Sequence, residues 1–205
     1  MKRLIAMLGL GLCVLVGAAQ AQAPEAEAEA LVRQTTEQVL SALEQNKERI
    51  KDDPLAVQAL VGDIVLPNFD FELMSRLVLA RGWREATPEQ QKRFVNEFRQ
   101  LLIRTYGTSL SHYSGQKVEY LPSQPDPDPK RATVRTLIRQ VEGPPVPVTY
   151  QLRQTGSGWK VFDVVIEGVS LVQNYRTSFA AEIQQHGLDA LIQRIHERNV
   201  RPGAA

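Results

Sequence analysis

The stretch VPVTYQLRQTGSGWKVFDVVIE, residues 146–167, decides the fold. Alternate residues of its first half are apolar, as in a strand with one buried face: Val146, Val148, Tyr150 and Leu152. Gly156-Ser157-Gly158 supplies a turn, and from Trp159 onward both alternating sets are largely apolar. Two-sided apolar character is typical of a central strand that is covered on both faces. The stretch therefore predicts two adjacent antiparallel strands, 146–154 and 159–167.

Two further strands precede this hairpin. Residues 117–121 and 132–141 are rich in Val, Ile, Tyr and Thr, which favour extended backbone. A Pro- and Asp-rich loop at 122–129 separates them, and Gly143-Pro144-Pro145 leads into the hairpin. The order predicts a four-stranded antiparallel meander.

Apolar residues recur at helical spacing on both sides of the sheet segment. They predict helices over 31–52, 54–65, 71–80, 87–110, 170–185 and 188–199. Asp70 and Ser170 are suited to cap two of these helices, and Thr87 with Gln90 to form a capping box. Gly82 is suited to a left-handed helix end. This order predicts an α+β fold, in which a curved antiparallel four-stranded sheet packs against N- and C-terminal helices.

The chain begins with a pattern typical of a cleaved secretory signal. Lys2 and Arg3 precede an apolar stretch that ends in Ala19-Gln20-Ala21. Cleavage after Ala21 removes Cys13, the only cysteine, so we expect the exported protein to lack thiols and disulfides. Residues 22–30 are interpreted as a flexible leader or a frayed first helical turn. The expected organisation is a signal at 1–21, this leader at 22–30, one domain at 31–199 and a polar tail at 200–205.

Composition and motifs exclude several function classes. The 24 Lys and Arg residues nearly balance the 23 Asp and Glu, whereas a general nucleic-acid binder needs a basic excess. The three histidines lack metal-binding spacing, and there is no phosphate-binding or dinucleotide motif. Near matches to a serine elbow at 107–111 and 168–172 lack the final glycine. We therefore expect no catalytic residue, no metal site and no cofactor.

Three arginines fall close together between two predicted helices. Arg76, Arg81 and Arg84 are suited to hold an anionic headgroup or to dock an acidic partner. The alternative is a solvated helix face, and the residues alone leave both interpretations open.

Two blocks of sequence resemble one known family. The first contains FDFELMSR at 69–76, WREATPEQQ at 83–91 and RTY at 104–106. The second contains WKVFDV at 159–164, IEGVSL at 166–171 and NYR at 174–176. Together they resemble the MlaC family, also called toluene-tolerance Ttg2D proteins, over about 32–195. One departure is LARG at 79–82, where the family pattern leads us to expect the glycine near position 80.

The resemblance implies a periplasmic phospholipid carrier of Gram-negative bacteria that is not an enzyme. Such a carrier moves lipid between two complexes and so maintains outer-membrane lipid asymmetry. Its implied partners are an inner-membrane ABC transporter complex with an MCE-domain component and an outer-membrane lipoprotein–porin complex. Family members hold acyl tails in an apolar pocket between the helices and a curved sheet.

On that basis we expect the pocket to be lined by the inward stripes of two helices and by sheet residues. The expected lining is Leu73, Met74, Leu77, Val78, Phe98, Leu102, Tyr106, Val148, Tyr150, Leu152, Phe162, Val164 and Ile166. The arginines at 76, 81 and 84 are expected to contact a headgroup or partner. Two alternatives stay open: a binding or chaperone module for another apolar ligand, and a lipid esterase, which the missing serine elbow disfavours.

Overall fold

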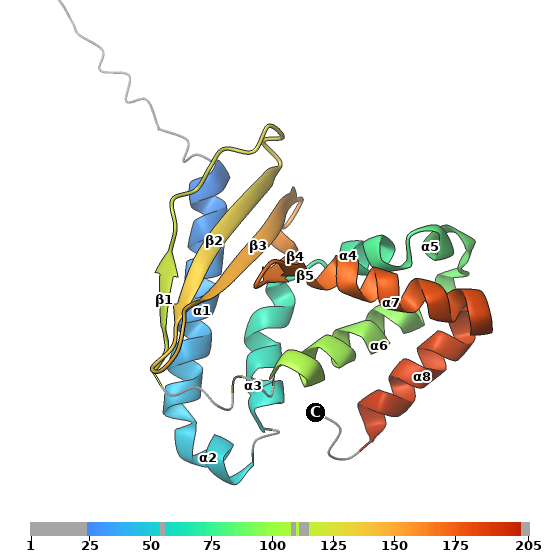
Figure 1. Cartoon of the computed structure of the whole chain (residues 1–205), viewed down its shortest axis with the longest axis horizontal. Helices are drawn as coiled ribbons and strands as arrows, with labels where there is room; N and C mark the ends of the chain where they lie inside the picture. The colour runs from blue at the N-terminus through green and yellow to red at the C-terminus, as the bar shows by residue number, and fades with distance from the viewer. Residues whose placement is uncertain (1–23, 54–55, 108–109, 111–114, 202–205) are drawn as a thin grey trace, which may run out of the picture.

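A computed structural model describes residues 24–53, 56–107, 110 and 115–201 (Figure 1). Helices precede and follow one sheet, which confirms the α+β fold class. The helices are α1 (Pro24–Gln45), α2 (Lys47–Asp52), α3 (Ala56–Val65), the short 3-10 helix η1 (Leu66–Asn68), α4 (Phe71–Leu79), α5 (Arg81–Glu85), α6 (Pro88–Gly107), α7 (Leu171–His186) and α8 (Leu188–Val200). The strands are β1 (Lys117–Tyr120), β2 (Arg131–Arg139), β3 (Val146–Thr155), β4 (Gly158–Ile166) and β5 (Val169–Ser170).

The sheet has five strands rather than the four predicted. Its order is β1-β2-β3-β4-β5, and every neighbouring pair is antiparallel. The additional strand, β5, follows a two-residue turn in which Glu167 and Gly168 both have positive φ, 50° and 84°. Such turns match the twist of antiparallel strands. A two-residue strand is too short to show an alternating pattern, so the sequence did not reveal it.

A β-bulge explains the two-sided apolar pattern of β4. Gln151 pairs with Asp163, but the next residue, Leu152, pairs with Val161, so Phe162 has no partner on β3. One extra residue reverses the alternation of side chains along a strand. Trp159 and Val161 therefore face the same core as Val164, while Phe162 packs among the helices. Our interpretation of two alternating apolar sets missed this change of phase.

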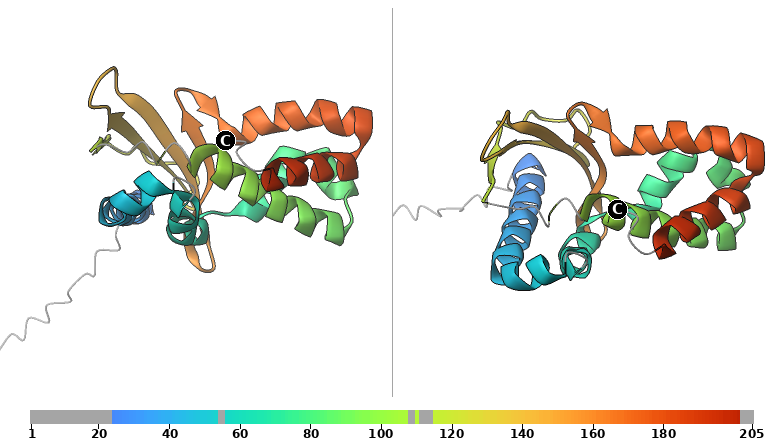
Figure 2. Two further views of the ribbon diagram at one scale, coloured as in Figure 1. Left: turned by 90° about the horizontal axis from the view of Figure 1, so that it is seen from below. Right: turned by 60° about the horizontal axis from the view of Figure 1, so that its bottom comes forward.

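Helix α1 covers one face of the curved sheet (Figure 2). It begins at Pro24, so residues 24–30, which we interpreted as a flexible leader or a frayed first helical turn, form its first turns. Ala28 is fully buried against the sheet, and Trp159 Nε1 donates a hydrogen bond to Glu27 Oε2 at 3.2 Å. These contacts come from residues far along the chain, which local composition does not report. The expected signal at 1–21 lies outside the described residues.

Helices α4, α5, α6, α7 and α8 form a second layer beside the β4–β5 side of the sheet (Figures 1 and 2). Three predicted caps are confirmed. Asp70 Oδ1 accepts from Leu73 N at 2.9 Å, and Ser170 Oγ accepts from Gln173 N at 3.0 Å. Thr87 and Gln90 form the reciprocal capping box, with bonds of 3.0 and 3.2 Å. The helix starts are therefore set by local side-chain chemistry.

The apolar side chains of the described residues are buried in three cores. The helical core joins α4, α6, α7 and α8, and its largest fully buried side chains are Phe94, Phe98 and Met74. The sheet core joins the first turns of α1 to β2, β3 and β4. A small third core, around Val39, Leu43, Ile50 and Val57, joins the end of α1 to α2 and α3.

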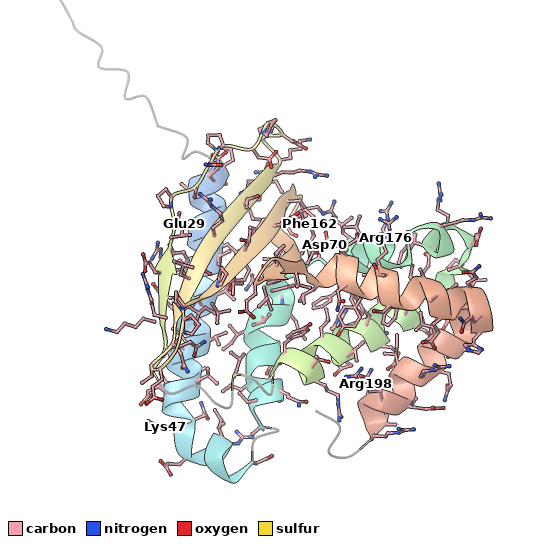
Figure 3. The ribbon with its side chains drawn as sticks, in the orientation of Figure 1. Glu29, Lys47, Asp70, Phe162, Arg176 and Arg198 are labelled. Carbon is pink, nitrogen blue, oxygen red and sulfur yellow. The ribbon has the colours of Figure 1, made fainter. Side chains whose placement is uncertain are left out.

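Asp70 connects the helical layer to the sheet. Its backbone N–H donates to Val161 O on β4 at 2.8 Å, beside a bridge between Phe69 and Val161. Its carboxylate caps α4 and also forms an ion pair with Arg153 of β3. One residue thus fixes where α4 leaves the sheet (Figure 3).

The turn between α4 and α5 departs from our prediction. Ala80, not Gly82, has the positive φ, at 50° with ψ −109°. Gly82 lies inside α5. A residue with a Cβ is strained in this region of backbone space, whereas glycine is not. The strain falls at the position where the resemblance led us to expect glycine.

We predict that Ala80→Gly raises the free energy of unfolding by about 1 kcal/mol, because it removes this backbone strain. Urea unfolding of the purified protein measures the change. Ala86→Gly is the matched control, since Ala86 has a φ of −73° and glycine there only adds chain entropy to the unfolded state. Equal effects at both positions would contradict the assignment of strain to Ala80.

Candidate functional site

The structure divides the expected pocket lining between two cores. The helical core takes Leu73, Met74, Leu77, Val78, Phe98, Leu102 and Phe162. The sheet core takes Val148, Tyr150, Leu152, Val164 and Ile166. Met74, Phe98 and Leu152 are fully buried and fill these cores. The expected sheet wall is also incomplete, because the bulge turns Phe162 away from Val164 and toward the helices.

Tyr106 and Phe69 join the two cores. Both are half-buried, and each packs against the helical core and against the sheet core. Tyr106 also lies beside Tyr175 of α7, and burial, followed by that neighbour, raises the pKa of Tyr106 to about 12. We call the boundary marked by Tyr106 and Phe69 the seam. It is the place where the two expected walls of a ligand site meet.

Tyr150 puts a hydroxyl group within the apolar face of the sheet. Its side chain lies near Thr136, whose Oγ1 donates to Val148 O at 3.1 Å. Burial is the main cause that raises the pKa of Tyr150 to about 12. The hydroxyl therefore stays protonated at ordinary pH and remains a neutral hydrogen-bonding group beside apolar side chains.

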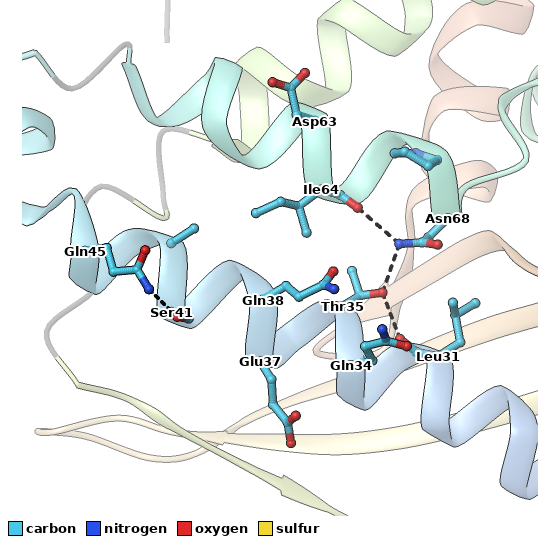
Figure 4. Close-up of a pocket in the computed structure, with 12 residues that line it drawn as sticks. Leu31, Gln34, Thr35, Glu37, Gln38, Ser41, Gln45, Asp63, Ile64 and Asn68 are labelled. Atoms are coloured by element: carbon cyan, nitrogen blue, oxygen red, sulfur yellow. Dashed lines mark hydrogen bonds between the residues drawn. The ribbon is translucent and has the colours of Figure 1, made fainter.

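A groove of about 830 Å³ lies between α1 and the α3–η1 segment (Figure 4). Its centre is polar and ordered: Asn68 Nδ2 donates to Thr35 Oγ1 at 3.0 Å and to Ile64 O at 3.1 Å. Leu31, Ile64 and Pro67 add apolar surface. The sequence pattern predicted both helices but gave no signal for the groove between them, because the groove depends on how the two helices pack.

A second groove, of about 650 Å³, lies where the start of α4 meets the end of the β3–β4 hairpin. Phe69 and Phe71 stack there with ring centroids 5.8 Å apart. Arg99, Arg153 and Lys160 line the same groove, together with Asp70 and Glu72. The groove thus combines aromatic surface with charged side chains.

The three arginines of the α4–α5 region differ in their contacts. Arg81 Nε lies 2.6 Å from Glu85 Oε1, and this hydrogen bond raises the pKa of Arg81. Arg76 and Arg84 are exposed on the same helices. None of the three lines either groove, so a contact with a headgroup or a partner stays a prediction for them.

Ser170, from the second near match to a serine elbow, and the histidine at 196 have structural partners. Ser170 Oγ donates to Asp163 Oδ2 at 2.6 Å, and Asp163 Oδ1 accepts from Val172 N at 3.1 Å, so both serve the start of α7. His196 Nδ1 lies 2.9 Å from Glu97 Oε1 between α8 and α6.

Within 24–53, 56–107, 110 and 115–201, no group of three or more His, Cys, Asp or Glu side chains is placed to hold a metal ion. Not one helix of that part combines the length and apolar composition that a bilayer crossing needs.

Fold and side chains together define a class of protein. It is an α+β protein in which helices cover the apolar face of a curved antiparallel sheet, with aliphatic and aromatic side chains where the two layers meet. The family model described as "MlaC protein" matches residues 33–197. The chain therefore belongs to the MlaC family.

Individual relatives agree with this assignment. The chain is 34% identical over 160 residues to the toluene tolerance protein ttg2D of Pseudomonas putida, covering 78% of this chain and 74% of that protein. It is 26% identical over 175 residues to the intermembrane phospholipid transport system binding protein MlaC of Haemophilus influenzae, covering 84% and 82%. A solved phospholipid-binding protein from Ralstonia solanacearum, in complex with a phospholipid, is 32% identical with a TM-score of 0.78, covering 84% of this chain and 97% of that chain.

We predict that alkali destabilises the protein partly through Tyr150. An unfolded tyrosine has a pKa of about 10, whereas Tyr150 has about 12 when folded. The protonated hydroxyl is thus favoured by folding, and its contribution is complete below pH 10 and lost as the pH rises toward 12. Urea unfolding at pH 8, and at stepwise higher pH values up to 12, measures this loss of stability.

Tyr150→Phe is the comparison. At pH 8 its free energy of unfolding is expected to lie within about 1 kcal/mol of the wild-type value. Above pH 10 the stability of this variant is expected to fall less steeply than that of the wild type. Parallel curves for the two proteins would show that the buried hydroxyl is not a source of the alkaline loss.

Proposed function

We propose that this protein is a soluble phospholipid carrier of the periplasm. It holds the acyl tails at the seam, between the apolar face of the sheet and the helical core, which meet at Tyr106 and Phe69. The observation that carries the proposal is the Ralstonia relative. This chain matches the fold of the Ralstonia protein over 97% of that protein's length, at 32% identity. The structure of the Ralstonia protein contains a phospholipid.

The physical need for such a carrier follows from the cost of exposed acyl chains. Burying one CH₂ group is worth about 0.8 kcal/mol, so a 16-carbon chain in water costs on the order of 12 kcal/mol. A carrier lowers this cost by replacing bilayer contacts with its own apolar side chains. The side chains on either side of the seam, such as Leu77, Tyr150 and Ile166, are the half-buried groups suited to make those contacts.

We propose further that the carrier moves phospholipid between two membrane complexes. One is an inner-membrane ABC transporter complex with an MCE-domain component, and the other is an outer-membrane lipoprotein–porin complex. Family membership supports this role, as does the name of the Haemophilus relative, an intermembrane phospholipid transport system binding protein. The signal pattern at 1–21 supports export to the periplasm.

Native mass spectrometry of the protein purified from a bacterial periplasm tests the proposal. We expect a mass excess equal to one or two phospholipids, which organic extraction then identifies. A fatty acid or an isoprenoid in their place would favour a binding module for another apolar ligand. Protein without ligand would contradict the carrier function.

We predict that Ile166→Asp removes most of the bound phospholipid, at least fivefold, because a carboxylate is costly to desolvate against an acyl chain. Ile166 is half-buried at the edge of the sheet core. Val141→Asp is the matched control, since Val141 is 67% exposed beyond the end of β2, whereas Val169 is the direct cross-strand partner of Ile166. Circular dichroism confirms that both variants fold. Equal lipid content in the two would contradict the placement of the tails beside Ile166.

A further inference from the structure

The sheet has a second face, which points away from α1. We call it the open face; on β2 and β3 it consists of Arg131, Thr133, Arg135, Leu137, Arg139, Pro147, Thr149, Gln151 and Arg153. None of these nine residues is buried. Their neighbours on the other face, such as Ala132, Val134 and Leu152, belong to the sheet core. Three of the nine, Arg131, Arg139 and Pro147, are exposed and the other six are half-buried, so the open face is accessible to solvent.

Basic residues stand directly opposite one another across this face. Lys117 pairs in register with Arg139, Arg131 with Arg153, and Arg153 with Lys160. Like charges at directly opposed positions destabilise a sheet. All three such pairs are positive in a chain whose charges almost balance. Because such pairs lower the stability of the sheet, their presence on an accessible surface indicates a role in binding rather than in folding.

The nearby carboxylates compensate only part of this charge. Glu119 binds Arg139 at 2.6 Å, Asp128 lies 3.7 Å from Arg131, and Asp70 pairs with Arg153. Asp163 is buried and serves the start of α7. Arg135 and Lys160 donate to the neutral carbonyl oxygens of Pro122 and Pro67. Cations therefore outnumber carboxylates on the open face.

The open face continues into the second groove, because Arg153 and Lys160 belong to both. There Arg99 adds a further cation, 5.4 Å above the ring of Phe71, and Glu72 lies on the rim. Phe69 and Phe71 provide a stacked aromatic surface beside these charges. The groove is thus suited to an apolar side chain that is flanked by carboxylates.

We propose that the open face and the second groove form one docking surface for a carboxylate-rich segment of a protein partner. This inference rests on the proposed carrier function, and the partner is a component of one of the two membrane complexes. Arginine forks pair with carboxylates in bidentate geometry, and a basic surface speeds the encounter with an acidic one.

A membrane surface fits the same region less well. Firm interfacial binding combines electrostatic attraction to anionic lipids with apolar side chains that enter the headgroup layer. Among the described residues, the exposed large apolar side chains are Val141, Val169 and Val200, and none belongs to the open face.

The double variant Arg131→Glu/Lys160→Glu tests the docking surface. Each change puts a carboxylate opposite Arg153 but also removes a contact, that of Arg131 with Asp128 or that of Lys160 with Pro67 O, so the melting temperature of the variant is measured first. The matched control is Lys47→Glu/Arg198→Glu, which makes the same change of charge on α2 and α8 (Figure 3). If the test variant melts lower, Lys160→Gln replaces it.

The probes are the two membrane complexes of the same bacterium, each in nanodiscs of zwitterionic lipid, and vesicles that contain phosphatidylglycerol. We expect the double variant to bind at least one complex tenfold or more weakly at low salt, and the control to change less than twofold. Unchanged binding to both complexes overturns the proposal, and so does a loss confined to the anionic vesicles. Native mass spectrometry of the same samples reports the bound phospholipid separately, so failure of docking is distinguished from failure of the carrier function.

Discussion

The ion pair between Asp70 and Arg153 is the interaction on which the arrangement of the two layers depends. The same carboxylate caps α4, and the backbone of Asp70 bonds to Val161 of β4. The side chain of Asp70 is only 11% exposed, so water screens this pair far less than it screens a pair on the surface. Because one residue holds α4 to both β3 and β4, it also places Phe69 at the seam and Phe71 beside the second groove.

The two faces of the sheet have different physical roles. The face beneath α1 is apolar and shares its core with the first turns of that helix. The open face is cationic, and it retains opposed like charges that a purely structural sheet would avoid. A carrier of the proposed kind needs both properties, because its ligand is apolar while its encounters with membrane complexes occur in water.

Much of the fold follows from features that are local in the chain. The caps at Asp70, Thr87 and Ser170 were predictable because each joins residues three positions apart. The burial of Ala28 was not, since it depends on the distant sheet. Strand β4 is buried on both faces, as the sequence predicted, but the bulge at Phe162 changes which residues share a face, and the apolar pattern alone does not show such a change. The expected lining was correctly apolar, but its division between two cores arises only from packing.

Three small cores in place of one have a consequence for the lifetime of the protein. Regions with separate cores open separately, each with its own free energy, and proteases attack the open forms. Here Phe69 and Tyr106 are the side chains that belong to both of the larger cores. An acyl chain at the seam would act as a removable part of the interior, and by mass action it would hold the layers closed. The cargo would then govern how long its carrier survives, with empty molecules degraded first.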